Sequence, residues 1–159
     1  MTQNQSNNQE SVTYASFGRR LAAYLIDGMI LSAIISTLAA LGILSLIGVN
    51  LDLSQLQDPS YSLANNKGYL FATFIVGTLY YTLLQSSKWQ ATIGKKLLGV
   101  KVVTLEGDRI SFFRAIIRHL VMFSISSLFY FGFIMALFTK RKQTLHDLLA
   151  KTLVIKETK

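Results

Sequence analysis

The sequence contains no cysteine and only two histidines among its 159 residues. Without cysteine the chain has no disulfide, no thiolate metal ligand and no cysteine nucleophile. His119 and His146 are too few and too scattered to build a metal site, and no serine stands in a nucleophile-elbow context. Gly94-Lys95-Lys96 is similar to part of a phosphate-binding loop, but Lys96 stands where that loop needs Ser or Thr. We therefore expect no metal, no cofactor and no enzyme activity.

Acidic residues are also scarce, with 8 Asp and Glu against 16 Lys and Arg and a formal net charge of +8. Such an excess can indicate a nucleic-acid partner, but here the cations flank apolar blocks, where anionic lipid headgroups explain them better. We expect no nucleic-acid binding. The first 16 residues lack Lys, Arg and a short apolar core. They predict a disordered polar N-terminus, 1–16, and no cleavable signal peptide.

Hydrophobic residues, in contrast, make up 51% of the chain and are arranged in blocks. The first block runs from Leu21 to Gly48, and the only charge inside it is Asp27. A helix of that length would measure about 42 Å, against about 30 Å of bilayer hydrocarbon. We therefore expect a membrane-spanning helix at about 20–48.

A second apolar block, Tyr69 to Leu84, follows a loop at 49–68 that is poor in cations. It is short, but it can span if its ends lie at the membrane interface, so we expect a second spanning helix at about 69–85. The segment 86–118 is rich in Lys and Arg, which by the positive-inside rule places it in the cytoplasm. Within it, Ser111 to Arg118 predicts an amphipathic helix that lies on the membrane surface.

The third apolar block, at 119–139, is followed by a basic tail, 140–159. If the block spanned, the cations of the tail would lie outside the cell, against the positive-inside rule. Val100 to Leu105 and Thr152 to Ile155 predict two short strands that need each other as partners, which also favours a cytoplasmic tail. The block therefore either spans or, as the charges favour, forms a broken, re-entrant helical pair.

Polar and small side chains on the first helix are the candidate functional residues. Arg20 and Asp27 lie on one helix face, and an aspartate at mid-membrane costs about 2.5 to 3.5 kcal/mol. Asp27 is either a protonatable cation site or a structural partner of Arg20, or of a Tyr or Thr on the second helix. A stripe of small residues allows close approach by a second copy of the chain or by the second block: Gly28, Ser32, Ser36 and Ala40.

Four pieces of the sequence together resemble the RDD family of small bacterial membrane proteins, named for one arginine and two aspartates. In the order of the family, they are RRLAAYLID, TIGKKLLGVKVV, RAIIRHL and RKQTLHDLLAKTLV. The resemblance places the arginine of the family on Arg20, its first aspartate on Asp27 and its second on Asp147. It implies an RDD-like membrane domain over 17–155 and a transport role.

These patterns predict a mainly α-helical, multi-pass protein of the bacterial inner membrane, with two full transmembrane helices and a short cytoplasmic strand pair. One function that fits is transport of a monovalent cation or proton by an oligomer, with Arg20, Asp27 and Asp147 in one polar cluster. The other is a non-catalytic scaffold whose basic cytoplasmic face binds anionic lipid or a protein partner. Membrane lipids, with a second copy of the chain or another membrane protein, are the expected partners. His146 is expected to be exposed.

Overall fold

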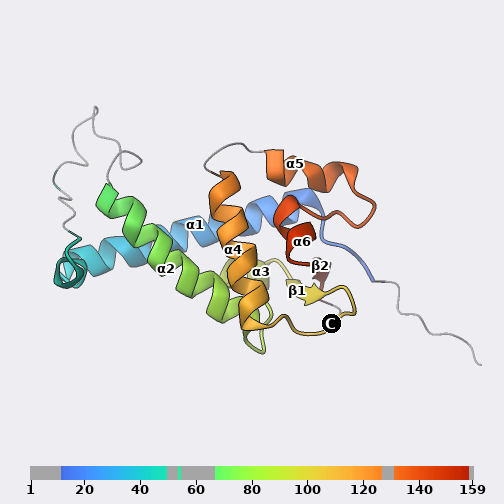
Figure 1. Cartoon of the computed structure of the whole chain (residues 1–159), viewed down its shortest axis with the longest axis horizontal. Coiled ribbons are helices and arrows are strands. Elements are labelled where there is room, and N and C mark those ends of the chain that lie inside the picture. The colour runs from blue at the N-terminus through green and yellow to red at the C-terminus, as the bar shows by residue number, and fades with distance from the viewer. Residues whose placement is uncertain (1–11, 50–53, 55–66, 127–130, 158–159) are drawn as a thin grey trace, which may run out of the picture.

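The structure is a computed structural model that describes residues 12–49, 54, 67–126 and 131–157. Figure 1 shows α3, both strands, α5 and α6 gathered around the N-terminal half of α1, while η1 and the start of α2 lie at the other end of α1. The described elements are α1 (Phe17–Ala40), η1 (Leu44–Ile47), α2 (Lys67–Ser86), α3 (Ile93–Leu97), β1 (Val100–Thr104), α4 (Phe112–Ser126), α5 (Phe131–Phe138), α6 (Leu145–Leu149) and β2 (Thr152–Lys156).

Among the described residues, α1 is the one helix that is long and apolar enough to cross a membrane. It ends at Ala40, earlier than the expected residue 48, because Gly42 adopts a left-handed conformation with φ +68°. The amide of Gly42 donates to the carbonyl of Ala39 at 2.9 Å, and that of Ile43 to the carbonyl of Leu38 at 3.0 Å. This pair of bonds is the Schellman motif, which ends a helix. The remaining helix still measures about 36 Å.

The second helix, α2, agrees with the expected 69–85 to within the usual uncertainty of helix ends. It meets α1 in a small apolar core that contains Ile35 and Ala72, with Leu38, Ala39 and Val76 packed against it. The stripe of small residues is not covered by this contact, since all four of its members are exposed: Gly28, Ser32, Ser36 and Ala40. The predicted loop at 49–68 lies almost entirely outside the described residues.

One helix, α4, takes the place of two expected features, the surface helix from Ser111 to Arg118 and the start of the third apolar block. The helix continues without a boundary because Arg118 and His119 are buried inside the protein rather than placed among headgroups. The rest of the block contains α5. The 15 residues of α4 and the 8 of α5 measure about 22 Å and about 12 Å, so neither helix alone reaches across about 30 Å of hydrocarbon.

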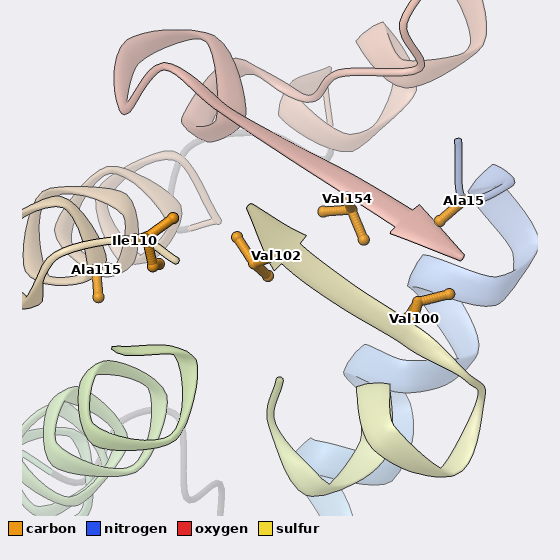
Figure 2. Close-up of a cluster of buried hydrophobic side chains, with 6 residues drawn as sticks. All are labelled: Ala15, Val100, Val102, Ile110, Ala115 and Val154. Atoms are coloured by element: carbon orange, nitrogen blue, oxygen red, sulfur yellow. The ribbon is translucent and has the colours of Figure 1, made fainter. Parts of the chain in front are cut away.

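The predicted strand pair is confirmed. β1 and β2 run antiparallel, with Val102 opposite Val154. Figure 2 shows how the valines of both strands point into one buried cluster with side chains from the segments before α1 and α4 and from α4 itself. The members of this core are Ala15, Val100, Val102, Ile110, Ala115 and Val154.

Residues 13–15, which we expected to belong to the disordered N-terminus, instead lie along β2. The amide of Ala15 donates to the carbonyl of Val154 at 2.9 Å, and the amide of Lys156 donates to the carbonyl of Thr13 at 2.8 Å. A two-stranded sheet leaves strand edges that can accept another segment, so a polar sequence can be held here by its backbone alone. Both ends of the described chain therefore lie at the same end of α1. Residues 1–11 are outside the described part.

Candidate functional site

The first turn of α1 places Arg20 inside the protein, where its side chain is 4% exposed. Its Nη1 atom forms an ion pair with Oδ2 of Asp147, which is fully buried on α6. The same guanidinium donates to two backbone carbonyls, that of Ala15 at 3.4 Å and that of Val154 at 3.5 Å. Arg20 therefore ties the start of α1 to α6, to β2 and to the segment that pairs with β2.

Asp147 has a second cationic partner, Arg118 of α4. Nη2 of Arg118 lies 2.8 Å from Oδ1 of Asp147, and Nη1 donates to Oγ1 of Thr152 at 3.4 Å. The carboxylate also accepts from the amide of Thr144 at 3.1 Å, which closes a capping box at the start of α6. Burial opposes the charge of Asp147, but Arg118 and Arg20 outweigh it and hold the pKa of the carboxyl well below its usual range. Asp147 is therefore ionised throughout the physiological range.

His146 is buried, which differs from the expectation that it is exposed. Its Nε2 atom lies 2.8 Å from Oγ1 of Thr144 and 3.7 Å from Oδ1 of Asp147. Burial lowers the pKa of His146 to about 3, and the nearby arginines add to this while Asp147 opposes it. At neutral pH the imidazole is therefore uncharged and serves as a hydrogen-bonding group.

The second buried carboxylate, Asp27, is held by uncharged donors. Oδ1 accepts from the hydroxyl of Tyr80 at 2.7 Å and from the amide of Gly94 at 2.8 Å. Oδ2 accepts from the hydroxyl of Thr92 at 2.6 Å. Tyr80 belongs to α2, and Thr92 is the N-cap of α3. Asp27 thus fastens the turn between these two helices onto α1.

Gly94 makes the contact between α1 and α3 sterically feasible. A Cβ atom at this position would collide with the carbonyl oxygen of Ala23 and would lie 2.8 Å from Oδ1 of Asp27. Only a residue without a side chain allows the amide to reach the carboxylate at this distance.

Within the part of the chain that the structure describes, Lys95 is the third buried lysine or arginine, with Arg20 and Arg118, and it is 9% exposed. Its ammonium group lies 5.6 Å from the centre of the Tyr81 ring. Burial and the charge of Arg118 lower the pKa of Lys95 to about 8, although Asp27 and Asp147 both oppose this change. The side chain therefore lies within electrostatic reach of both buried carboxylates.

Comparison with known proteins covers most of the chain. The model of the RDD family matches residues 14–151. The chain belongs to the RDD family. It is also 34% identical over 146 residues to a protein of Bacillus subtilis (strain 168) named "Uncharacterized protein YxaI", a match that covers 89% of this chain and 96% of that protein. No solved structure matches the chain. RDD proteins are membrane proteins, and α1 is long and apolar enough to cross a bilayer, so this RDD protein is a membrane protein.

The three residues that we expected to form one polar cluster in this RDD protein lie in two separate clusters. Arg20 and Asp147 contact each other, whereas Asp27 has its own donors on α2 and α3. The two clusters are separate because Asp27 lies seven residues after Arg20 on α1, which places it about 10 Å further along the helix axis. The guanidinium of Arg20 is directed the other way, toward α6 and β2.

Sequence reasoning missed two of the site's charged residues, Arg118 and Lys95. Both lie in the cation-rich segment 86–118, where neighbouring Lys and Arg residues made each of them look solvent-exposed. Both also lie within pieces that resemble the family, RAIIRHL and TIGKKLLGVKVV. In RAIIRHL, Arg118 stands among apolar residues at helical spacing. This pattern is the signal that could have predicted the burial of Arg118.

Proposed function

We propose that this RDD protein is a non-catalytic, multi-pass scaffold of the bacterial inner membrane that binds anionic lipid at its cytoplasmic end. The observation that carries the proposal is that both buried carboxylates are already occupied. Asp27 accepts three hydrogen bonds, and Asp147 contacts two arginines. A cation-transport site needs a carboxylate that exchanges its partners for an ion, whereas these two hold the fold together.

The positions of the chain ends support the proposed topology. The segment before α1 bonds to β2, so the N-terminal and C-terminal parts of the described chain share one end of α1. We call it the basic end because exposed cations of the described chain occur there: Arg109, Lys140, Arg141, Lys142 and Lys151. The positive-inside rule favours a cytoplasmic position for it. With α1 and α2 as the two spans, we expect residues 111–139 to form a re-entrant pair of short helices that enters and leaves the membrane on this side.

The outer face of α4 supports lipid contact. Phe113 is 76% exposed, and Phe112, Ile117 and Leu120 are also exposed on this helix. Apolar side chains next to cations are typical of helices that lie in the membrane interface. Each Lys or Arg close to an anionic surface adds about 1 kcal/mol of attraction. The basic end therefore has both the apolar and the cationic groups that anionic lipid requires.

A lipid-dependent unfolding measurement tests this proposal. In a neutral detergent, added phosphatidylglycerol should raise the unfolding temperature of the purified chain more than phosphatidylcholine does. Replacing Lys140, Arg141 and Lys142 together by Gln should remove most of this difference, because these exposed cations lie at the basic end. Lys67→Gln is the matched control, since Lys67 starts α2 at the opposite end. An equal response to phosphatidylglycerol in the triple variant and the unchanged chain would overturn the proposal.

Transport of a monovalent cation or proton by an oligomer is the second candidate, and Lys95 favours it. This buried base, with a pKa of about 8, lies within electrostatic reach of Asp27. A path through several copies would need close helix packing, for which the exposed stripe containing Ser32 and Ser36 is available. In liposomes, a cation or proton flux that Asp27→Asn abolishes in a folded protein would favour transport over the scaffold.

A further inference from the structure

A cavity of about 210 Å³ lies between α1, α2 and α4. Its walls are largely apolar and aromatic, with Leu31 and Ile35 on α1, Tyr81 on α2 and Phe123 on α4. No charged side chain lines it among the residues that the structure describes. An apolar cavity of about 150 Å³ can hold a benzene ring, so this one has room for a ring with a small substituent.

Two polar side chains of the cavity wall have hydrogen-bonding atoms without a partner in the described structure. His119 is 5% exposed, and both of its ring nitrogens lack a hydrogen bond. The hydroxyl of Thr73 is also buried without a partner. Buried polar groups are nearly always paired in native proteins, so a set of unpaired atoms around a cavity indicates a missing ligand or water.

The two groups line the same cavity from the neighbouring helices α2 and α4. The imidazole of His119 stacks on Tyr81 with a centroid distance of 5.0 Å, and it lies against Gly77 of α2. Thr73 is one helical turn before Gly77, which corresponds to about 6 Å along the helix. Two hydrogen bonds of about 2.8 Å that meet at one hydroxyl oxygen at a near-tetrahedral angle span about 4.6 Å, which is of the same order as this rise.

We infer that this cavity binds a neutral, ring-sized molecule that carries a hydroxyl group, in chemical class a phenol. A neutral imidazole has one donor and one acceptor nitrogen, and a hydroxyl both donates and accepts, so a single phenolic oxygen can pair with His119 and Thr73 together. The ring then occupies the apolar space beside Phe123. The ring can belong to a free phenol or to the head of a membrane-dissolved molecule with a long apolar tail. This inference does not depend on the scaffold role.

Nitrogen NMR of the full chain, labelled with ¹⁵N at its two histidines, tests the inference in detergent micelles. Phenol should shift the ring signals of His119 saturably and leave His146, which is paired with Thr144, in place. His119→Phe keeps an aromatic ring there and assigns the signals by removing one set. Toluene, which matches phenol in size but lacks the hydroxyl, should produce no such shift. Saturation by 4-nonylphenol as well would identify the membrane-dissolved source, and saturation by phenol alone the free one.

Thr73→Val and Thr78→Val form a matched pair of variants on α2. Thr73→Val should weaken phenol binding about tenfold, because one hydrogen bond to the ligand is lost. Thr78 does not line the cavity, and its hydroxyl already donates to the carbonyl of Phe74 at 2.6 Å, so Thr78→Val should leave binding unchanged. The inference is overturned if neither phenol nor 4-nonylphenol shifts the His119 signals saturably, or if toluene shifts them as phenol does. It is also overturned if the two valine variants bind phenol with equal affinity. Those outcomes would indicate that water or lipid alone fills the cavity.

Discussion

The two buried carboxylates of this protein are stabilised by different chemistry. Asp147 lies between the guanidinium groups of Arg20 and Arg118, whereas Asp27 accepts hydrogen bonds from a phenol, an alcohol and a backbone amide. Asp147 belongs to the basic end, and Asp27 belongs to the apolar part of α1. An ion pair removes two charges from water, while neutral donors satisfy a carboxylate without burying a second charge. The deeper position therefore uses the arrangement that buries less charge.

The two carboxylates also join different parts of the chain. Asp147 brings together α1, α4, α6 and the strand pair, and its removal affects the contacts among them. Asp27 joins α1 to the turn between α2 and α3, and it depends on the close approach that Gly94 allows. Substitutions at the two positions should therefore differ both in size and in the contacts that fail.

The largest effect is expected from Asp147→Asn. The variant leaves Arg20 and Arg118 buried without a counter-charge, which should cost about 3 to 5 kcal/mol of the free energy of unfolding. Thermal unfolding of the purified chain in detergent measures the loss. Asp108→Asn is the control, because Asp108 is exposed and its replacement should change stability by less than about 0.5 kcal/mol. Equal unfolding temperatures for the two variants would show that the arginines do not depend on Asp147.

A smaller effect is expected from pH, through Lys95. The folded chain releases the lysine proton near pH 8, whereas the unfolded chain holds it up to about 10.4. Between these values the unfolded chain binds more protons, so the stability contributed by Lys95 rises with pH, by on the order of 3 kcal/mol over the whole window. Lys95→Met removes this pH-dependent contribution. The unfolding temperature of the variant minus that of the unchanged chain should therefore be highest below pH 8 and fall as pH rises. The difference for Lys88→Met, at an exposed position, should stay constant.

The smallest of the three effects is expected from Gly94→Ala. The added methyl group collides with the carbonyl of Ala23, so α3 must move away from α1 and weaken the bond from the Gly94 amide to Asp27. Overpacking of this kind costs about 1 to 3 kcal/mol. Gly18→Ala is the control, because a Cβ at Gly18 of α1 meets nothing within 4 Å and alanine favours the helix. A loss of stability in both variants alike would contradict the close-packing argument.

The elements that the sequence predicts well depend on local patterns. The strands at Val100 to Leu105 and Thr152 to Ile155 follow from β-branched runs, and their pairing follows because a lone short strand is unstable. α2 follows from one uninterrupted apolar block. The end of α1 was misplaced because Gly42 lies inside an apolar run, where hydrophobicity alone gives no reason to stop the helix.

The contacts of the site are less predictable because they join distant residues. Thr92 lies 65 positions after Asp27, and no periodicity connects the two. The pairing of Arg20 with Asp147 was expected, through the family resemblance and the charge rule, as part of one polar cluster that also held Asp27. The burial of Lys95 could not be read from composition, because a cation-rich segment has the same composition whether its charges face water or the protein interior. For Arg118 the helical spacing of its apolar neighbours offered a signal that composition does not.

The pairing of the two ends of the chain sets the order in which the protein is completed during synthesis. Arg20 and Asp147 are separated by 127 positions. At about 5 to 20 residues per second, the ribosome delivers the aspartate roughly 6 to 25 s after the arginine. Throughout that interval the nascent chain carries α1 without the carboxylate and without the strand that holds the segment before it. The basic end can therefore close only after Asp147 has been made, and a ribosome that stops before Asp147 leaves a chain with none of the contacts of this carboxylate.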